Sequence, residues 1–262
     1  MRRGLERISV VVAAPLLAIA AAASGWAPAP DSVLTADEAA RRVDAHAYYP
    51  QAHGLDALLA RVSVPAFDSL FAANGARTPS IEFLWRAPDT RRFLVGPSRA
   101  TTLRAQVVQL LEGRGDLIVP RPLVETLARY ETRSAQSRGD TLVLTASTSD
   151  TTLDLRALRA VVETGQWRLV RLEARTARGT LVSVNDYQQA EDLNIVSRMN
   201  VRYENLLARV WIEHAPVGTL WLASKITYAI RGGSAGESLH RFDIRLDEFR
   251  VNQDVPDSAG ER

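Results

Sequence analysis

The chain contains no cysteine, and this absence excludes several kinds of chemistry at once. Without thiols it can form no disulfide, no cysteine-ligated metal site and no thiolate nucleophile, and it cannot be acylated on a cysteine. Aromatic residues are scarce at 6%, and Lys225 is the one lysine among 32 basic residues. The balance of 46% hydrophobic and 24% charged residues is nevertheless that of an ordinary globular protein.

The chain also lacks a large net charge. Its formal charge is +2 over 262 residues, and the first 23 residues carry Arg2, Arg3 and Arg7 against Glu6. The rest of the chain is therefore close to neutral. A nearly neutral chain gives no sign of the basic surface that nucleic-acid binding requires, so we expect no nucleic-acid partner.

The N-terminus has the layout of a secretory signal peptide. A short basic stretch, residues 1–7, is followed by an apolar run of 16 residues, 8–23, and then by the small residues Ser24 and Gly25. We therefore predict a signal peptide over residues 1–25, a flexible leader over 26–33 and a periplasmic location. An uncleaved membrane anchor is the alternative, although 16 residues fall slightly short of the roughly 17 to 25 that span a bilayer.

Helical spacing dominates the sequence up to about residue 140. Thr35 and Glu38 form a capping box ahead of apolar residues at helical intervals. The apolar residues of the segment 55–62 have the spacing of a second helix. The elements expected in this part are helices at 35–47, 55–62 and from Pro65, strands at 81–86 and 91–95, and helices at 103–111 and 122–130.

After residue 140 the apolar residues alternate with a period of two, which predicts β-strands. At Asp247 and Glu248 the alternation changes phase, because Phe249 and Val251 take the other parity. A β-bulge produces such a change, so we expect one there. The expected strands cover residues 141–146, 153–163, 166–174, 180–189, 201–211, 220–230 and 240–251.

Long strands joined by short connections predict one sheet. We therefore expect an α+β fold, in which a curved antiparallel sheet forms an incomplete β-barrel and the helices pack on its concave face. No linker-like stretch interrupts residues 32–255. The sequence thus predicts a single domain over residues 34–258, followed by a disordered tail at 259–262.

Catalytic motifs are few. The segment Gly232–Gly236 matches the G-x-S-x-G pattern of a nucleophile elbow, but strand-like alternation follows it where a helix is required. We interpret it as a hairpin loop. No pair of histidines has metal-ligand spacing, so neither a metal nor a cofactor is predicted. The four histidines are His46, His53, His214 and His240.

Two short motifs resemble the periplasmic outer-membrane lipoprotein carriers of the LolA/LolB-like superfamily. The first is Ile81-Glu-Phe-Leu-Trp-Arg-Ala-Pro88 followed by Arg91-Arg-Phe-Leu-Val95, and the second is the tail from Phe242 to Ser258 with its Val-Asn and Val-Pro-Asp-Ser steps. The resemblance implies an open barrel that holds acyl chains of lipoproteins or related lipids. It also implies that Arg86 couples loading to opening, although Ala87 stands between it and Pro88.

An acyl-chain carrier needs an apolar cavity, because a 16-carbon chain gains about 13 kcal/mol on leaving water. Residues with inward parity on the expected sheet are candidates to line it, although apolar residues at this period commonly form a filled core. The predicted ligand-binding residues are Phe83, Trp85, Arg86, Phe93, Trp167, Leu220, Leu222, Phe242 and Ile244.

The predicted function is thus a periplasmic carrier or sensor for acyl chains, without catalysis, which could also contact envelope membrane proteins. Two other functions remain open. One is a secreted hydrolase whose site is assembled from residues distant in sequence. The other is a scaffold subunit of an envelope complex, for which an exposed apolar patch would be the sign.

Overall fold

The computed structural model describes residues 34–152, 154–232 and 239–255. The predicted signal peptide 1–25, the leader 26–33 and the tail 259–262 lie outside these residues. Within the described ranges, no helix is both long and apolar enough to cross a membrane.

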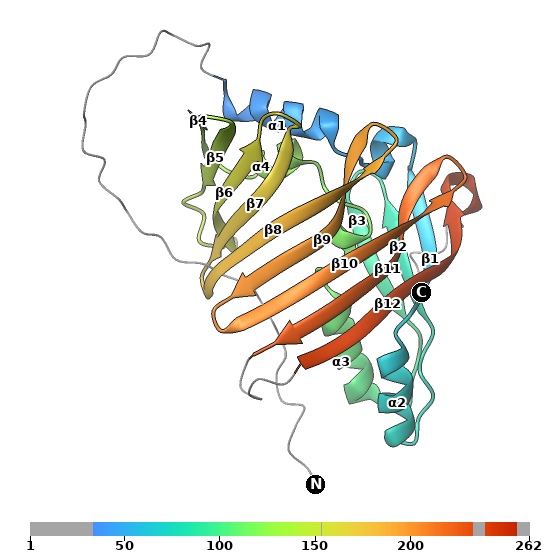
Figure 1. Cartoon of the computed structure of the whole chain (residues 1–262). Coiled ribbons are helices and arrows are strands. Elements are labelled where there is room, and N and C mark those ends of the chain that lie inside the picture. The colour runs from blue at the N-terminus through green and yellow to red at the C-terminus, as the bar shows by residue number, and fades with distance from the viewer. Residues whose placement is uncertain (1–33, 153, 233–238, 256–262) are drawn as a thin grey trace, which may run out of the picture. The chain divides into compact units, whose positions relative to one another are not determined.

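Twelve strands form one sheet in the order β3-β2-β1-β12-β11-β10-β9-β8-β7-β6-β5-β4 (Figure 1). Strands β3 and β4 are its two ends, so the sheet is not closed into a barrel. The predicted α+β class with a curved, open antiparallel sheet is confirmed. The strands are β1 Ala57–Ser63, β2 Ile81–Arg86, β3 Thr90–Val95, β4 Thr132–Arg138, β5 Thr141–Ser147, β6 Leu155–Glu163, β7 Arg168–Thr176, β8 Gly179–Ala190, β9 Leu193–Tyr203, β10 Leu206–Val217, β11 Leu220–Arg231 and β12 Leu239–Val251.

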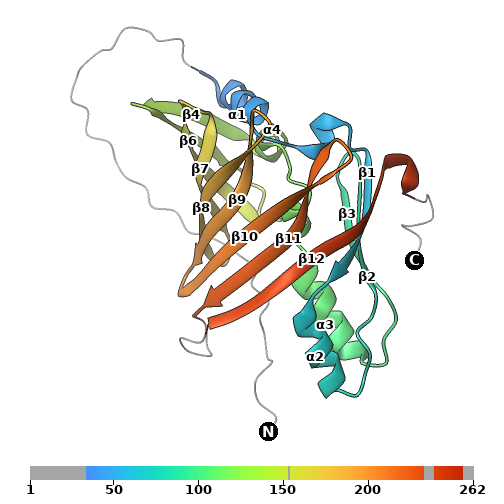
Figure 2. The ribbon, with the colours of Figure 1, turned by 45° about the vertical axis from the view of Figure 1, so that its right-hand side comes forward.

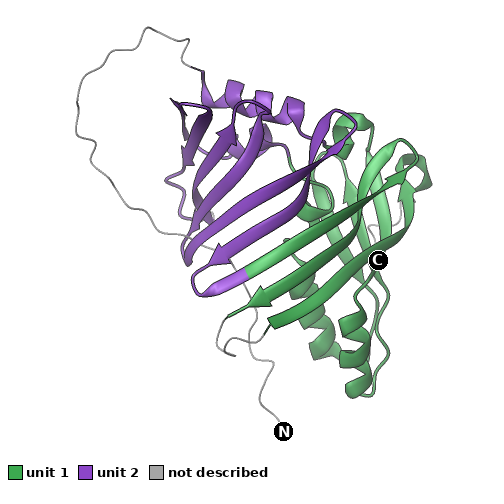
Figure 3. Cartoon of the chain, viewed as in Figure 1, with its two compact units in different colours: residues 1–10, 49–121, 208–262 green, residues 11–48, 122–207 purple. Residues whose placement is uncertain are grey.

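The helices are short and lie mostly in the first half of the described chain. Four are α-helices: α1 Ala36–His46, α2 Pro65–Ala73, α3 Thr101–Leu111 and α4 Leu123–Leu127. Three are 3₁₀ turns: η1 Pro50–His53, η2 Gly115–Leu117 and η3 Asn252–Asp254. Figure 3 shows two compact units: unit 1 takes in residues 49–121 and 208–262, and unit 2 takes in 11–48 and 122–207. The single domain over 34–258 stays a prediction.

In unit 2, α1 packs against α4 and against strands β4, β5 and β7. The Thr35 hydroxyl accepts a hydrogen bond from the Glu38 backbone N–H and so begins the helix, as the capping box predicts. The carboxylate of Asp44 accepts from the backbone N–H groups of Leu123 and Val124 and so caps α4. The buried side of α1 consists of small residues, which lets the helix approach the sheet closely: Ala36, Ala39, Ala40 and Val43.

In unit 1, the segment predicted as a helix at 55–62 is instead strand β1. Residues Ala57–Ala60 are all buried, because β1 lies between β2 and β12 and both of its faces are covered. A strand buried on both faces shows no alternation, and its leucines then fall at helical intervals by coincidence. The helix prediction was therefore wrong for this segment.

The bulge predicted at Asp247–Glu248 is confirmed. Along β12, Arg61 of β1 pairs with Asp247 while Leu59 pairs with Arg250, so one extra residue is inserted in β12. The insertion lies at Glu248, whose φ of 50° is in the left-handed region. The insertion lets Leu246 and Val251 each face a buried partner despite their opposite parity.

Helices α2 and α3 of unit 1 lie next to each other in the views of both Figure 1 and Figure 2. Each buries one apolar stripe, and α2 contacts β12 while α3 contacts β3. The predicted helices at 103–111 and from Pro65 are thereby confirmed. The buried residues of the two stripes are Phe67 and Phe71 in α2 and Leu103, Val107 and Leu111 in α3.

Candidate functional site

Most of the predicted ligand-binding residues of unit 1 share one face of the sheet. Cross-strand pairing places Phe93 opposite Phe83, with ring centroids 5.0 Å apart. Pairing of β2 with β1 and of β1 with β12 carries the same face to Ile244. We call this the apolar face of unit 1. It holds Trp85, Phe83, Phe93, Phe242 and Ile244 with Ile226 and Tyr228, and Leu220 and Leu222 have the same parity on β11.

Burial divides this face into a filled part and an accessible part. Phe83, Trp85 and Ile244 are at most 1% exposed, so they belong to the packed core. Leu220 and Leu222 are buried as well. In contrast, Phe93 and Phe242 are only half-buried. Any ligand that binds without unpacking the core must therefore meet the face near these two aromatic rings.

Two predicted residues lie elsewhere. Arg86 pairs with Ala57 and Thr90 at the end of β2, and its parity is opposite to that of Trp85, so it is not on the apolar face. Trp167 belongs to unit 2, in the turn between β6 and β7, where the guanidinium of Arg42 lies 5.2 Å from its ring centroid. The binding roles of the nine residues stay predictions.

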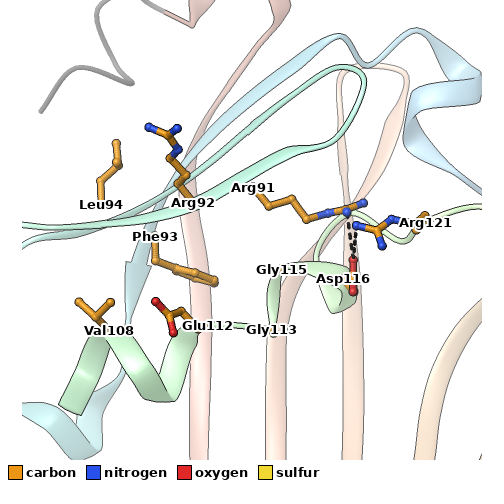
Figure 4. A pocket seen from close by; sticks show the side chains of 10 residues that line it. All are labelled: Arg91, Arg92, Phe93, Leu94, Val108, Glu112, Gly113, Gly115, Asp116 and Arg121. Carbon is orange, nitrogen blue, oxygen red and sulfur yellow. Dashed lines mark ion pairs between the residues drawn. The ribbon is translucent and has the colours of Figure 1, made fainter. Parts of the chain in front are cut away.

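A pocket of about 440 Å³ opens beside Phe93 in unit 1 (Figure 4). End strand β3, helix α3 and the segment 112–121 form its walls. In the close-up, Phe93 points toward α3, where Val108 and Glu112 lie, whereas Arg92 and Leu94 point to the other side of the strand. The pocket thus joins an apolar wall to a charged rim.

The charges on that rim are largely balanced. Arg91 forms ion pairs with Asp89 and with Asp116, the latter at 3.1 Å, and it donates to the Val119 carbonyl. Arg121 pairs with Asp89 at 2.6 Å. These pairs tie the segment 112–121 to β3, so the pocket has little net attraction for a free ion.

A second cluster lies beside the pocket and was not predicted. The rings of Tyr228 and Phe242 stack at 4.8 Å with an interplanar angle of 11°. The guanidinium carbon of Arg114 lies 5.4 Å from the centroid of the Tyr228 ring. Burial raises the pKa of Tyr228 to about 12, against a smaller lowering by the Arg114 charge. The phenol is thus a neutral hydrogen-bond donor at any physiological pH.

The turn that carries Arg114 is pressed closely onto the sheet. Gly113 adopts a φ of 76°, which favours glycine. A Cβ on Gly115 would lie 3.1 Å from Cε2 of Phe83 and 3.2 Å from Cδ of Arg91. Glycine at this position therefore allows the segment to contact the apolar face. The local sequence pattern does not indicate that contact.

The histidines are dispersed. His46 ends α1, and its Nδ1 lies 2.8 Å from the Arg42 carbonyl oxygen. Desolvation lowers the pKa of His214 on β10 to about 4. Among the described residues, no three His, Asp or Glu side chains are grouped as metal ligands. Residues 233–236 of the G-x-S-x-G segment lie outside those residues, between the paired strands β11 and β12. No observation here favours the hydrolase.

The fold is similar to two solved structures. One is a LolA superfamily protein from Nitrosomonas europaea, with a TM-score of 0.37 and 12% identity, covering 86% of this chain and 96% of that one. The other is a domain from Vibrio parahaemolyticus named for outer membrane lipoprotein sorting, with a TM-score of 0.36 and 10% identity, covering 85% and 94%. No family model matches the sequence, and no curated protein matches it either.

Proposed function

We propose that this chain is a periplasmic carrier or sensor that binds the acyl chains of lipoproteins or related lipids. The observation that carries the proposal is the apolar face of unit 1 together with the pocket that opens at its half-buried Phe93. The proposed location rests on the signal-peptide pattern of residues 1–25.

The size and lining of the pocket support a hydrocarbon ligand. Its volume of about 440 Å³ lies within the roughly 300 to 1,000 Å³ that is usual for small-molecule sites. Phe93 and Val108 provide an apolar wall. Of the charged side chains beside it, Arg91, Asp116 and Arg121 form ion pairs, and Arg92 and Glu112 are exposed. An apolar chain can therefore enter without leaving a buried charge unpaired.

A substitution at Phe93 tests the proposed site. We expect Phe93→Asp to weaken the binding of a fluorescent 16-carbon fatty acid at least tenfold, because burying a carboxylate against the acyl chain costs more than the 1.4 kcal/mol that a factor of ten represents. The measurement is a fluorescence titration of the purified chain. Phe93→Leu keeps the apolar wall and should stay within about threefold of the wild type.

The matched control is Val184→Asp, which places the same charge on a 41% exposed residue of unit 2. It should leave binding unchanged, and circular dichroism of each variant checks that the fold is kept. Failure of the wild-type chain to take up the fatty acid would contradict the carrier function. If the folded Phe93→Asp variant keeps wild-type affinity, the acyl chain binds elsewhere and the proposed site is contradicted.

A further inference from the structure

Among the residues that the structure describes, no carboxylate forms an ion pair with Arg114. Its Nη1 donates to the backbone carbonyl of Leu110, one turn back in α3. Its Nε is buried and has no hydrogen-bond acceptor among the residues that the structure describes, and none of their carboxylates pairs with it. Its contact with Tyr228 uses the face of the ring and a neutral phenol, and so supplies no negative charge. A half-buried guanidinium in this state is short of an anionic partner.

Tyr228 presents a second donor at the same place. The residue is 6% exposed, and its hydroxyl is buried without a hydrogen-bond partner in the described ranges. The Arg114 guanidinium lowers the pKa of the phenol by its charge and as a hydrogen-bond donor toward the phenol oxygen, whereas the phenol's own proton has no acceptor among the described residues. Both groups can donate to one acceptor oxygen, since the Arg114 Nε and the Tyr228 hydroxyl have no acceptor among the described residues and Nη1 of Arg114 reaches only the neutral Leu110 carbonyl. Buried polar groups normally have hydrogen-bond partners, so two buried donors without acceptors at one place call for an explanation.

The neighbouring arginines differ from Arg114 in their charge partners, although the Nε of Arg121 is also buried without an acceptor among the described residues. Arg91 and Arg121 are paired with aspartates, and Arg104 donates to the carbonyl oxygens of Val95 and Gly96. Glu112, two residues before Arg114, lines the pocket and forms no ion pair with it. The unpaired donors therefore occur together at one point, where the segment after α3 contacts the apolar face.

We propose that Arg114 and Tyr228 hold the oxyanion of an acyl ligand, which is the carboxylate of a fatty acid or the phosphate of a phospholipid. This inference rests on the proposed function and names its ligand class. The guanidinium and the phenol donate to the same charged oxygen, while the hydrocarbon lies along Phe242 and the apolar face. A charge-assisted hydrogen bond in a site of low polarity is stronger than a neutral one, so an anionic ligand is preferred over a neutral one.

The test compares matched ligands on the full chain. Binding of a 16-carbon fatty acid is measured against its methyl ester, and that of a dipalmitoyl phosphatidic acid against dipalmitoyl glycerol, by competition with a fluorescent fatty acid. We expect the wild type to prefer the anionic member of at least one pair by about tenfold. Preference within the first pair identifies a fatty acid as the source of the oxyanion, and preference within the second identifies a phospholipid.

Three variants assign that preference to the cluster. Arg114→Gln should reduce the anion-to-neutral ratio to about one, Tyr228→Phe should reduce it about threefold, and Arg114→Lys, which keeps the charge, should retain much of it. Arg202→Gln, at an exposed position of β9, is the control and should leave the ratio unchanged. Thermal melting of each variant checks that the fold is kept.

The outcomes separate this inference from the proposed function. If the wild type shows no preference within either pair, or if folded Arg114→Gln keeps the full preference, the oxyanion site is contradicted while acyl binding stands. If no ligand of either pair binds to the wild type, the proposed function itself fails.

Discussion

Replacing Trp85 by alanine is expected to lower the free energy of unfolding by about 3 to 5 kcal/mol, the usual cost of removing a fully buried aromatic side chain. Trp85 is 1% exposed and lies on β2, between β1 and β3. Its partner across the strands is Leu58, which is fully buried as well. Urea unfolding of the two proteins measures the difference.

Trp85→Phe is the matched variant. The indole Nε1 is buried without a hydrogen-bond partner among the described residues, so its loss relieves an unpaired donor while the smaller ring leaves a cavity. We therefore expect the phenylalanine variant to lose less than half as much stability as the alanine variant. A loss below about 1 kcal/mol for Trp85→Ala would mean that this part of the apolar face is an open cavity, not packed core.

Replacing Asn252 by alanine is expected to cost about 2 kcal/mol, because three hydrogen bonds disappear together. The Asn252 Oδ1 accepts from the backbone N–H groups of Asp56 and Ala57, at 2.8 and 3.2 Å, and its Nδ2 donates to the Gly54 carbonyl at 2.7 Å. This side chain thus fixes the start of β1 against the end of β12. Its φ of 53° lies in the left-handed region, which asparagine tolerates better than alanine.

Two further substitutions separate the hydrogen bonds from the backbone conformation. Asn252→Gly removes the bonds but accepts the positive φ, so it should cost less than Asn252→Ala. Asn252→Asp keeps the acceptor for both N–H groups and loses only the bond to Gly54, so it should cost least. Equal stability of all three variants and the wild type would contradict this structural role. Chemical unfolding at neutral pH provides the values.

Most strands after residue 140 could be predicted because they alternate with a period of two. Strand β9, Leu193–Tyr203, was missed, because the strand expected at 201–211 runs across the turn at residues 204–205. The bulge at Glu248 could be predicted from the same pattern, since an inserted residue shifts the phase of the apolar alternation. Strand β1 could not be read in this way, because burial on both faces removes the alternation that distinguishes a strand from a helix. A strand that lies between two others and is buried on both faces thus has no alternating sequence pattern to identify it.

The candidate site was predicted only in part. Parity placed Phe93 and Phe242 correctly on one face, but it cannot tell a half-buried ring from a buried one. Arg114 could not be found, because its importance lies in a contact with Tyr228 across 114 positions of sequence and in the lack of an ion-pair partner among the described residues. Asn252 falls within a tail motif that resembles the carrier superfamily, and the structure gives that residue a physical role at β1.

Native mass spectrometry of the chain exported to a bacterial periplasm, followed by lipid extraction, tests the central claim most directly. The account predicts a stoichiometric adduct that is identified as an acyl lipid and is lost in Phe93→Asp. A bare protein mass for the wild type, with no uptake of added fatty acid, would contradict the claim that unit 1 carries an acyl-binding site.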